Sequence, residues 1–325
     1  GYSPKAVDYE NNYIDLFVDE VDPEQLSVDY YPLMKQDGNE NLLVKPSYFE
    51  NLDTLANKAK EEKLPFDWTI LAAGHKAGDG TYVTPTEEQL RWQMAVALAY
   101  GASSITHYIY ASHEEDYEPM IEWETYKPTD VYTRVKTVNQ ELKTWNDIYM
   151  SYSWLGTSKV DVGDKNLMLE RLDYDVPVSK YGCLSEVASD KDLLVGAFEN
   201  AEHQYAYMIT NAGDAKKLND IDYLAEFAME SASVTLHFKP GEYQCVAVVV
   251  DGEISFMPVD EDNSITLDIG AYDGAFVMPM VEGNVAMYAV KTGDSMHMYA
   301  VISAFVLSAA GIAGVVFAAR NKRHQ

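Results

Sequence analysis

The chain of 325 residues carries 52 acidic and only 24 basic side chains, which gives a formal net charge of −28 at pH 7. A surface of this sign repels the phosphates of nucleic acids, so we expect no DNA or RNA partner. The two cysteines, Cys183 and Cys245, are too few for a disulfide framework. We expect two buried, unpaired thiols, with a single bridge between them as the alternative.

The first half of the chain alternates between helical and extended patterns. Ser47 with Glu50, and Thr84-Pro85 with Glu87, form capping-box patterns, in which polar side chains satisfy free amides of the first helical turn. Together with the spacing of apolar residues, these signals divide the segment into elements. The predicted order is helix 9–21, strand 25–32, helix 47–63, strand 66–73, helix 84–100, strand 105–110 and helix 129–149.

This alternation predicts a parallel sheet covered by helices, either a doubly wound sheet or the last part of an eight-stranded barrel. After about residue 158 the pattern changes to short extended runs, and Asp251-Gly252 between two of them is a hairpin signal. Six or seven such strands predict a β-sandwich. The predicted domains are 1–154 and 155–282, followed by a linker over 283–297.

The C-terminal part of the chain contains an apolar segment, 298–319, that is 22 residues long and free of charge. A helix of that length measures ~33 Å, enough to cross the ~30 Å hydrocarbon core of a membrane. The basic tail 320–325 would then stay on the cytoplasmic side, which places the bulk of the protein outside the cell. The sequence thus predicts a transmembrane helix, with a buried core helix as the alternative.

Lys291-Thr292-Gly293-Asp294 stands just before this apolar segment. The Thr-Gly step, the hydrophobic stretch and the basic tail together resemble the sorting signal that sortases cleave in Gram-positive bacteria. The resemblance implies cleavage between Thr292 and Gly293 and attachment of Thr292 to the cell wall. That signal usually starts with Leu-Pro, whereas residues 289–290 are Ala-Val, so a plain membrane anchor is the alternative. Both interpretations place the protein on the cell surface.

Five segments of the first half also stand in a familiar order. They are LSVDYYP (26–32), PFDW (65–68), PTE (85–87), LAYGA (98–102) and ITHYIY (105–110). Together they resemble the last strands of TIM-barrel glycoside hydrolases of the β-galactosidase-like clan, in which a β-sandwich often follows the barrel. The resemblance implies a carbohydrate substrate, an oligo- or polysaccharide, and no cofactor.

The fold that the resemblance implies is the C-terminal part of a (β/α)8 TIM barrel, then a β-sandwich, then a C-terminal transmembrane helix. An exported protein needs an N-terminal export signal, and the chain starts at Gly1 without one. We therefore expect the C-terminal part of a longer precursor. In this clan a Glu nucleophile ends the seventh barrel strand, but the matching segment 66–73 contains no Glu.

Catalytic groups of such barrels lie at the carboxyl ends of the strands. In the segment 25–32, alternation places Ser27, Asp29 and Tyr31 on the inward side, and Asp29 lies near the strand's end. Glycoside cleavage needs carboxylates as proton donor, nucleophile or base, which makes Asp29 the first catalytic candidate. A structural Asp that accepts hydrogen bonds from loop amides is the alternative.

The two following strands offer further polar groups. His75 follows the second strand and is a candidate for binding a sugar hydroxyl, as is Tyr31. On the third strand His107 and Tyr110 have opposite parity, so at most one of them points inward. The acidic run 113–116 after that strand contains Glu114 and Glu115, which are candidates for the second acid, although such runs are often solvated loops.

The chain shows no Gly-rich phosphate loop, no Cys pair at zinc spacing and no paired-His helix motif, so no metal site is predicted. Two functions stay open. The first is the C-terminal part of a surface glycoside hydrolase, favoured by the order of the five segments. The second is a non-catalytic surface module that binds glycan or acts as a spacer, favoured by the absence of Glu from 66–73.

Overall fold

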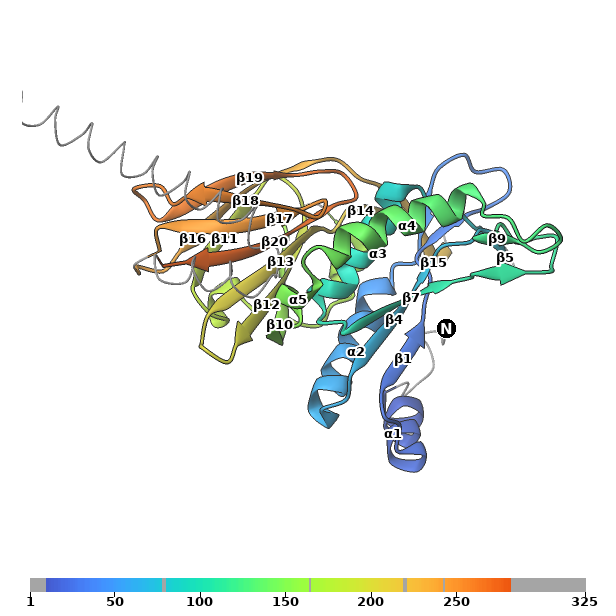
Figure 1. Ribbon diagram of the computed structural model, residues 1–325, viewed down its shortest axis with the longest axis horizontal. Coiled ribbons are helices and arrows are strands. Elements are labelled where there is room, and N and C mark those ends of the chain that lie inside the picture. Colours follow the sequence, from blue (N-terminus) through green and yellow to red (C-terminus); the bar gives the residue numbers. More distant parts are fainter. Residues whose placement is uncertain (1–9, 78–79, 164, 219–220, 242, 282–325) are drawn as a thin grey trace, which may run out of the picture.

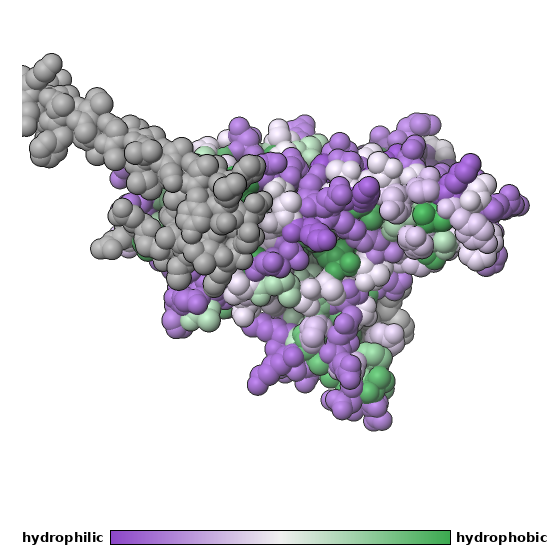
Figure 2. Space-filling view, in the orientation of Figure 1, coloured by the Kyte–Doolittle hydropathy of each residue, from purple (hydrophilic) through white to green (hydrophobic). Residues whose placement is uncertain are grey.

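A computed structural model describes residues 10–77, 80–163, 165–218, 221–241 and 243–281 (Figure 1). About 40% of these residues lie in strands and 24% in helices. The face of the molecule in Figure 2 is covered mostly by hydrophilic side chains with small apolar spots between them, in keeping with the high net charge.

Three strands form a small parallel sheet in the order β1-β4-β7. Leu26 of β1 is aligned with Phe66 of β4, and Trp68 of β4 with Ile105 of β7. One face of this sheet belongs to a core that it shares with two connecting helices, and Trp68 is completely buried there. The elements in chain order are a π-helical turn (Glu10–Asp15), α1 (Leu16–Val21), β1 (Leu26–Asp29), α2 (Tyr48–Glu62), β4 (Phe66–Leu71), α3 (Glu87–Ala99) and β7 (Ser104–Tyr108).

The two capping predictions have different outcomes. Ser47 occupies the N-cap position of α2, as predicted, but its hydroxyl bonds to Tyr30 rather than to the helix backbone. Thr84 does not cap α3. Thr86 does, because its Oγ1 accepts from the Gln89 amide at 3.2 Å while the Gln89 side chain accepts from the Thr86 amide at 3.0 Å. The helix therefore begins two residues later than the sequence pattern indicated.

Two antiparallel sheets pack face to face through an apolar core. The larger has the order β10-β12-β13-β20-β17-β18 and the smaller the order β11-β16-β19. The predicted hairpin at Asp251-Gly252 is confirmed, because both residues have positive φ and join β17 to β18. The strands are β10 (Tyr152–Val160), β11 (Leu184–Ser189), β12 (Leu193–Asn200), β13 (Tyr205–Asn211), β16 (Ala232–Phe238), β17 (Cys245–Val250), β18 (Glu253–Pro258), β19 (Ser264–Ile269) and β20 (Gly274–Met280).

The central strands of the larger sheet are buried on both faces. Val246 and Val248 of β17 point into the core between the two sheets, whereas Ala247 and Val249 belong to the core on the helical side. All seven residues of β20 are buried. In a strand that is covered on both faces, every side chain is buried, so polar residues do not alternate with apolar ones. This explains why these strands are continuous apolar runs in the sequence.

The same two-sided packing separates the cysteines. Cys183 lies in the core between the sheets and Cys245 in the core on the helical side. Both are buried and free, so the predicted unpaired state of the thiols is confirmed.

A second six-stranded sheet joins the two halves of the chain in the order β14-β15-β3-β2-β6-β5. Ala225 of β15 is aligned with Val44 of β3, across the predicted boundary at residue 154. The division into domains stays a prediction. The strands are β2 (Leu33–Lys35), β3 (Leu43–Val44), β5 (His75–Ala77), β6 (Gly80–Tyr82), β14 (Asp214–Leu218) and β15 (Ile221–Ala228).

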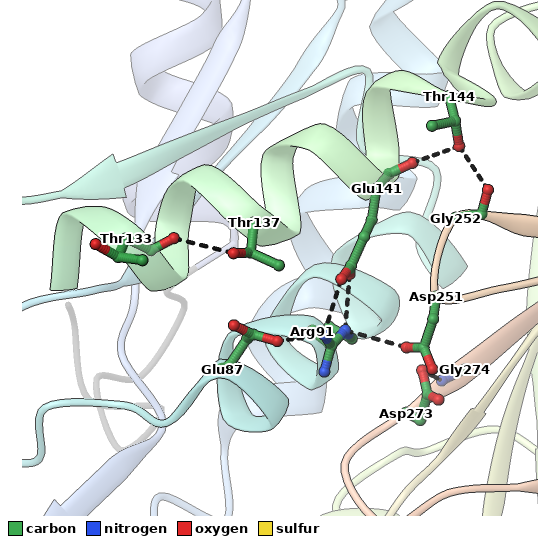
Figure 3. Close-up of polar contacts among 10 residues, drawn as sticks. All are labelled: Glu87, Arg91, Thr133, Thr137, Glu141, Thr144, Asp251, Gly252, Asp273 and Gly274. Carbon is green, nitrogen blue, oxygen red and sulfur yellow. Dashed lines mark hydrogen bonds and ion pairs between the residues drawn. The ribbon is translucent and has the colours of Figure 1, made fainter. Parts of the chain in front are cut away.

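The helical layer is tied to the larger sheet by polar contacts at the β17–β18 turn (Figure 3). Thr144, which follows α4, donates to the Gly252 carbonyl at 2.8 Å, and Arg91 of α3 lies 3.0 Å from Asp251. The remaining elements are β8 (Ala111–Ser112), β9 (Ile121–Glu122), α4 (Asp130–Lys143), α5 (Asn146–Tyr149), α6 (Leu167–Glu170) and a 3-10 turn (Val178–Lys180).

The predicted fold class is therefore wrong. The described part of the chain is mostly β-structure with several antiparallel sheets, and β1, β4 and β7 form an open three-stranded parallel sheet rather than part of a barrel. Segments between the parallel strands form β2, β3, β5 and β6, which pair with β14 and β15 instead of acting as plain loops. The proposed membrane segment 298–319 lies outside the described residues. Among the helices of the described residues, none is long and apolar enough to cross a membrane.

Candidate functional site

The site lies at the carboxyl ends of the parallel strands, the edge of an α/β sheet at which ligands usually bind. There the ring of His75 is surrounded by four tyrosines, Tyr31, Tyr82, Tyr108 and Tyr117, which we call the tyrosine cluster. Tyr31 follows β1, His75 begins β5 just after β4, and Tyr108 ends β7, so three adjacent strands supply its centre. Tyr82 from β6 and Tyr117 from the loop after β8 complete it.

His75 is held in one orientation. Its ring stacks on Tyr117 with the centroids 4.8 Å apart and the planes 4° from parallel, and Tyr82 lies at the same centroid distance. His75 Nδ1 donates to the Ala73 carbonyl at 2.8 Å, because a carbonyl oxygen can only accept. The proton is thus on Nδ1, which leaves Nε2 of the neutral ring as a hydrogen-bond acceptor.

Tyr31 connects the cluster to a carboxylate. Its ring stacks on Tyr108 at 5.3 Å, and its hydroxyl donates to Asp29 Oδ2 at 3.2 Å. Burial, followed by the charge of Asp29, raises the pKa of Tyr31, so the hydroxyl remains protonated. Asp29 itself is exposed, which places a negative charge at the rim of an otherwise aromatic site.

Lys45, which follows β3, supplies a cation next to this rim. Its Nζ donates to the Tyr82 hydroxyl and lies 4.8 Å from the ring centroid of Tyr30 and 4.6 Å from that of Tyr82. Burial lowers the pKa of Lys45 to about 8, while the charge of Asp29 acts in the opposite direction. An amine with this pKa is partly neutral near pH 8, whereas most lysines are fully charged there.

Asp67 has a structural position below the site. It is only 3% exposed and accepts hydrogen bonds from Ser27 at 2.7 Å and from Ser104 at 2.6 Å, one on each neighbouring strand. Thr106 adds a third hydroxyl at 3.1 Å. Asp67 therefore links β1, β4 and β7 through their open face, and its carboxylate is saturated by these donors.

The structure brings some of the predicted site residues together. Asp29, Tyr31 and His75 lie side by side in and around the cluster. Glu114 is exposed in the loop after β8, where its amide donates to the Ser112 hydroxyl at 3.1 Å. The pKa of Tyr108 is raised to about 12, mainly by its hydrogen bond to Tyr117, and the charges of Glu114 and Asp29 raise it further.

Other predicted residues lie elsewhere. His107 is aligned with Ile70 on the helix-facing side of the sheet, where its Nε2 has no partner and burial lowers its pKa to about 4. Tyr110 is 61% exposed. Glu115 is exposed in the loop after β8. The register therefore places His107 on the face of the sheet opposite to the cluster.

The predicted sorting residues lie outside the described part of the chain. They are Lys291, Thr292, Gly293 and Asp294.

Sequence reasoning missed Lys45, Tyr82, Tyr108 and Tyr117. Lys45 directly follows β3 and Tyr82 ends β6, two short strands of a sheet that also takes β14 and β15 from the second half of the chain, so no local pattern places these two residues at the cluster. The abundance of tyrosine, 24 residues, was the one available signal. In the described part of the chain, no group of three or more His, Cys, Asp or Glu side chains could hold a metal ion.

The arrangement suits a neutral, hydroxyl-rich ligand. Tyrosine rings offer flat apolar surfaces, and their hydroxyls, together with Asp29, Lys45 and His75 Nε2, offer both donors and acceptors. Tyr31 and His75 are each only 6% exposed, so a ligand would approach from the side of the half-buried Tyr82, Tyr108 and Tyr117 and the exposed Asp29.

Comparison with known proteins adds no assignment. No protein-family model matches the chain, and no curated protein matches it significantly.

Proposed function

We propose that the protein hydrolyses glycosidic bonds of a neutral oligo- or polysaccharide at the tyrosine cluster. Glycoside hydrolysis uses two carboxyl groups on either side of the bond that is cleaved. Asp29 is one candidate, and the observation that carries the proposal is its contact with Tyr31 at the rim of the cluster. Glu114 is the candidate for the other, because it stands in the loop that follows Tyr108 of the cluster, where its amide donates to the Ser112 hydroxyl at 3.1 Å.

In this proposal, the tyrosine rings bind the apolar face of a sugar and His75 Nε2 accepts a hydrogen bond from one hydroxyl. Lys45 donates to the Tyr82 hydroxyl and places a cation at the edge of the cluster. Asp29 would act as base or nucleophile, and the exposed Glu114 would exchange protons with solvent as the acid.

A second candidate function is non-catalytic glycan binding. It is favoured by β4, whose carboxyl end, Leu71-Ala72-Ala73, presents no carboxylate to the cluster. It is also favoured by the exposure of Asp29, since water around a carboxylate weakens its effect on a bound substrate.

An assay of both activities separates the two functions. The protein is incubated with linear neutral polysaccharides, namely β-1,4-linked glucan, xylan and mannan and β-1,3-linked glucan, and both reducing ends and binding are measured. Hydrolysis that falls by roughly a hundredfold in Asp29→Asn, but not in the matched loop variant Glu115→Gln, supports the catalytic function. Binding without hydrolysis supports the second function, and neither activity on any polymer overturns both.

We also propose that the protein is held on the surface of a Gram-positive cell by residues 291–319. The test is a reporter that carries this tail in a host with a sortase. Release of the reporter only by wall digestion, with Thr292 as its last residue, supports sorting. Extraction by detergent with the tail intact supports a membrane anchor, and secretion of the free reporter contradicts surface attachment.

A further inference from the structure

A segment next to the tyrosine cluster exposes three aromatic side chains. We call residues 109–128, which include β8 and β9, the aromatic arm. In the arm Tyr110 is 61% exposed, Trp123 49% and Tyr126 76%. Large aromatic side chains on the surface of a soluble protein are a common sign of a binding surface, in particular when several belong to one segment.

The arm has a defined backbone structure. The amide of Met120 donates to the Ile109 carbonyl at 3.3 Å, and that of Ile121 to the Tyr110 carbonyl at 2.8 Å. The Thr129 hydroxyl at the end of the arm donates to the Pro119 carbonyl at 2.8 Å. Trp123 packs against His113 from the other side of the arm, with the ring centroids 5.7 Å apart. The aromatic residues are thus presented by hydrogen-bonded backbone.

The arm is continuous with the cluster. Tyr117, which stacks on His75, belongs to it, and Tyr110 follows Tyr108 of the cluster by two residues. Ile121 pairs with Tyr110, and Trp123 stands two residues after Ile121. Two residues of extended chain span at most ~7 Å. The exposed rings therefore begin directly beside the cluster and extend away from it.

The charge of the arm restricts what it can bind. Its ionisable side chains are mostly carboxylates: Glu114, Glu115, Asp116, Glu118, Glu122 and Glu124, against Lys127. Such a surface repels phosphate groups and therefore also repels nucleic acids and anionic lipids. Carboxylates accept hydrogen bonds from hydroxyl groups, and aromatic rings bind apolar surfaces. A neutral glycan offers both, as hydroxyl groups around the edge of an apolar sugar ring.

We propose that the aromatic arm is a second sugar-binding subsite, contiguous with the tyrosine cluster, and that the substrate is therefore a chain of several neutral sugar units. This inference rests on the proposed function. Trp123 is the main binding residue, since its indole is the largest exposed ring in the arm and is held by His113. A disaccharide fills the cluster alone, whereas a hexasaccharide reaches the arm as well.

The test compares ligands of two lengths. Wild-type protein is titrated calorimetrically with linear hexasaccharides of β-1,4-linked glucose, xylose and mannose and β-1,3-linked glucose, and with the matching disaccharides. We expect Trp123→Ala to raise the Kd for the bound hexasaccharide about tenfold, which corresponds to a loss of about 1.4 kcal/mol. The Kd for the disaccharide stays unchanged, and Trp123→Tyr recovers most of the affinity for the hexasaccharide.

Two further variants make the outcome specific. Tyr223→Ala removes a similarly exposed aromatic side chain, 54% exposed, from β15, and should change neither Kd. Tyr31→Ala removes a ring of the cluster and should weaken binding of both ligands. If the wild-type Kd is the same for both lengths, or if Trp123→Ala changes neither, the subsite is overturned while the proposed function survives. If wild-type protein binds no member of the panel, both are overturned.

Discussion

Arg91 binds the carboxylate of Glu141 through two nitrogens, with Nε 2.7 Å from Oε2 and Nη2 2.8 Å from Oε1 (Figure 3). Because Arg91 lies on α3 and Glu141 on α4, this pair fixes the two helices to each other. Arg91 is also within 2.5 Å of Glu87 and 3.0 Å of Asp251, on the β17–β18 turn. A single guanidinium thus contacts carboxylates from both helices and from a turn of the larger sheet.

Replacement of Arg91 by Met should lower the free energy of unfolding by about 2–4 kcal/mol, because it leaves partly buried carboxylates facing one another without a cation. Arg91→Lys keeps the charge but loses the two-pronged geometry, and should lose less. Urea denaturation at pH 7 measures both. Equal stability of wild type and Arg91→Met would show that the carboxylates are well solvated without their cation.

Asp273 lies beside this group, with Arg91, Glu141 and Asp251 as its charged neighbours. Burial raises the pKa of Asp273 to about 6 from its ordinary value of 3.8, while its hydrogen bond from the Gly274 amide acts in the opposite direction. The folded state thus holds this proton more tightly than the unfolded state. The resulting stabilisation is complete below pH ~4 and is lost as the pH rises through about 6.

Asp273→Asn should therefore stabilise the protein relative to wild type at pH 7, by on the order of 1–3 kcal/mol, and have little effect at pH 4. Other carboxylates titrate in both proteins, so the difference between the two stabilities isolates Asp273. Thermal or urea unfolding between pH 4 and pH 8 gives this difference. A difference that does not change with pH would contradict the raised pKa.

Gly196 of β12 lies against the end of α3. A Cβ atom on this residue would stand 2.1 Å from the Ala99 carbonyl oxygen, which is backbone and has no room to move. Gly196→Ala should cost about 3 kcal/mol, the upper end of the usual range for overpacked cores. Gly270→Ala is a matched control, since its nearest neighbour would be Asp273 at 3.5 Å, an ordinary contact. Similar melting temperatures for the two variants would contradict the close packing of α3 on the sheet.

Lys45 should titrate near pH 8, because burial lowers its pKa, whereas exposed lysines ordinarily titrate near 10.4. The pKa of Lys45 is lower in the folded state than in the unfolded state. Its charged amine therefore destabilises the fold below pH 8, and this destabilisation disappears as the pH rises from 8 toward 10. Reductive methylation with ¹³C followed by NMR titration measures the midpoint, and Lys45→Met assigns the signal. A midpoint above 10 would mean that the amine is solvated rather than enclosed by Tyr30 and Tyr82.

Part of the site could be predicted from the sequence because strand ends obey a local rule. Alternation along a strand and the meeting of parallel strand ends at one edge were enough to group Asp29, Tyr31 and His75. The same rule left His107 and Tyr110 undecided. The register of β7 places Tyr108, aligned with Leu71, at the cluster instead. Register depends on contacts between strands, which no single-strand pattern contains.

The sequence by itself determined the net charge, the position of α2 and most of α3, the presence of strands in the predicted segments 66–73 and 105–110, and the turn at Asp251-Gly252, because periodicity, capping and turn chemistry act between near neighbours. Only the tertiary structure decided that β2, β3, β5 and β6 join β14 and β15, and so that Lys45 donates to Tyr82 of the cluster. These pairings link residues up to 185 positions apart, as between Asn41 and Glu226. Contacts between such distant segments form because the apolar surfaces of both segments are buried together. They therefore depend on the assembled core rather than on the sequence of either segment alone.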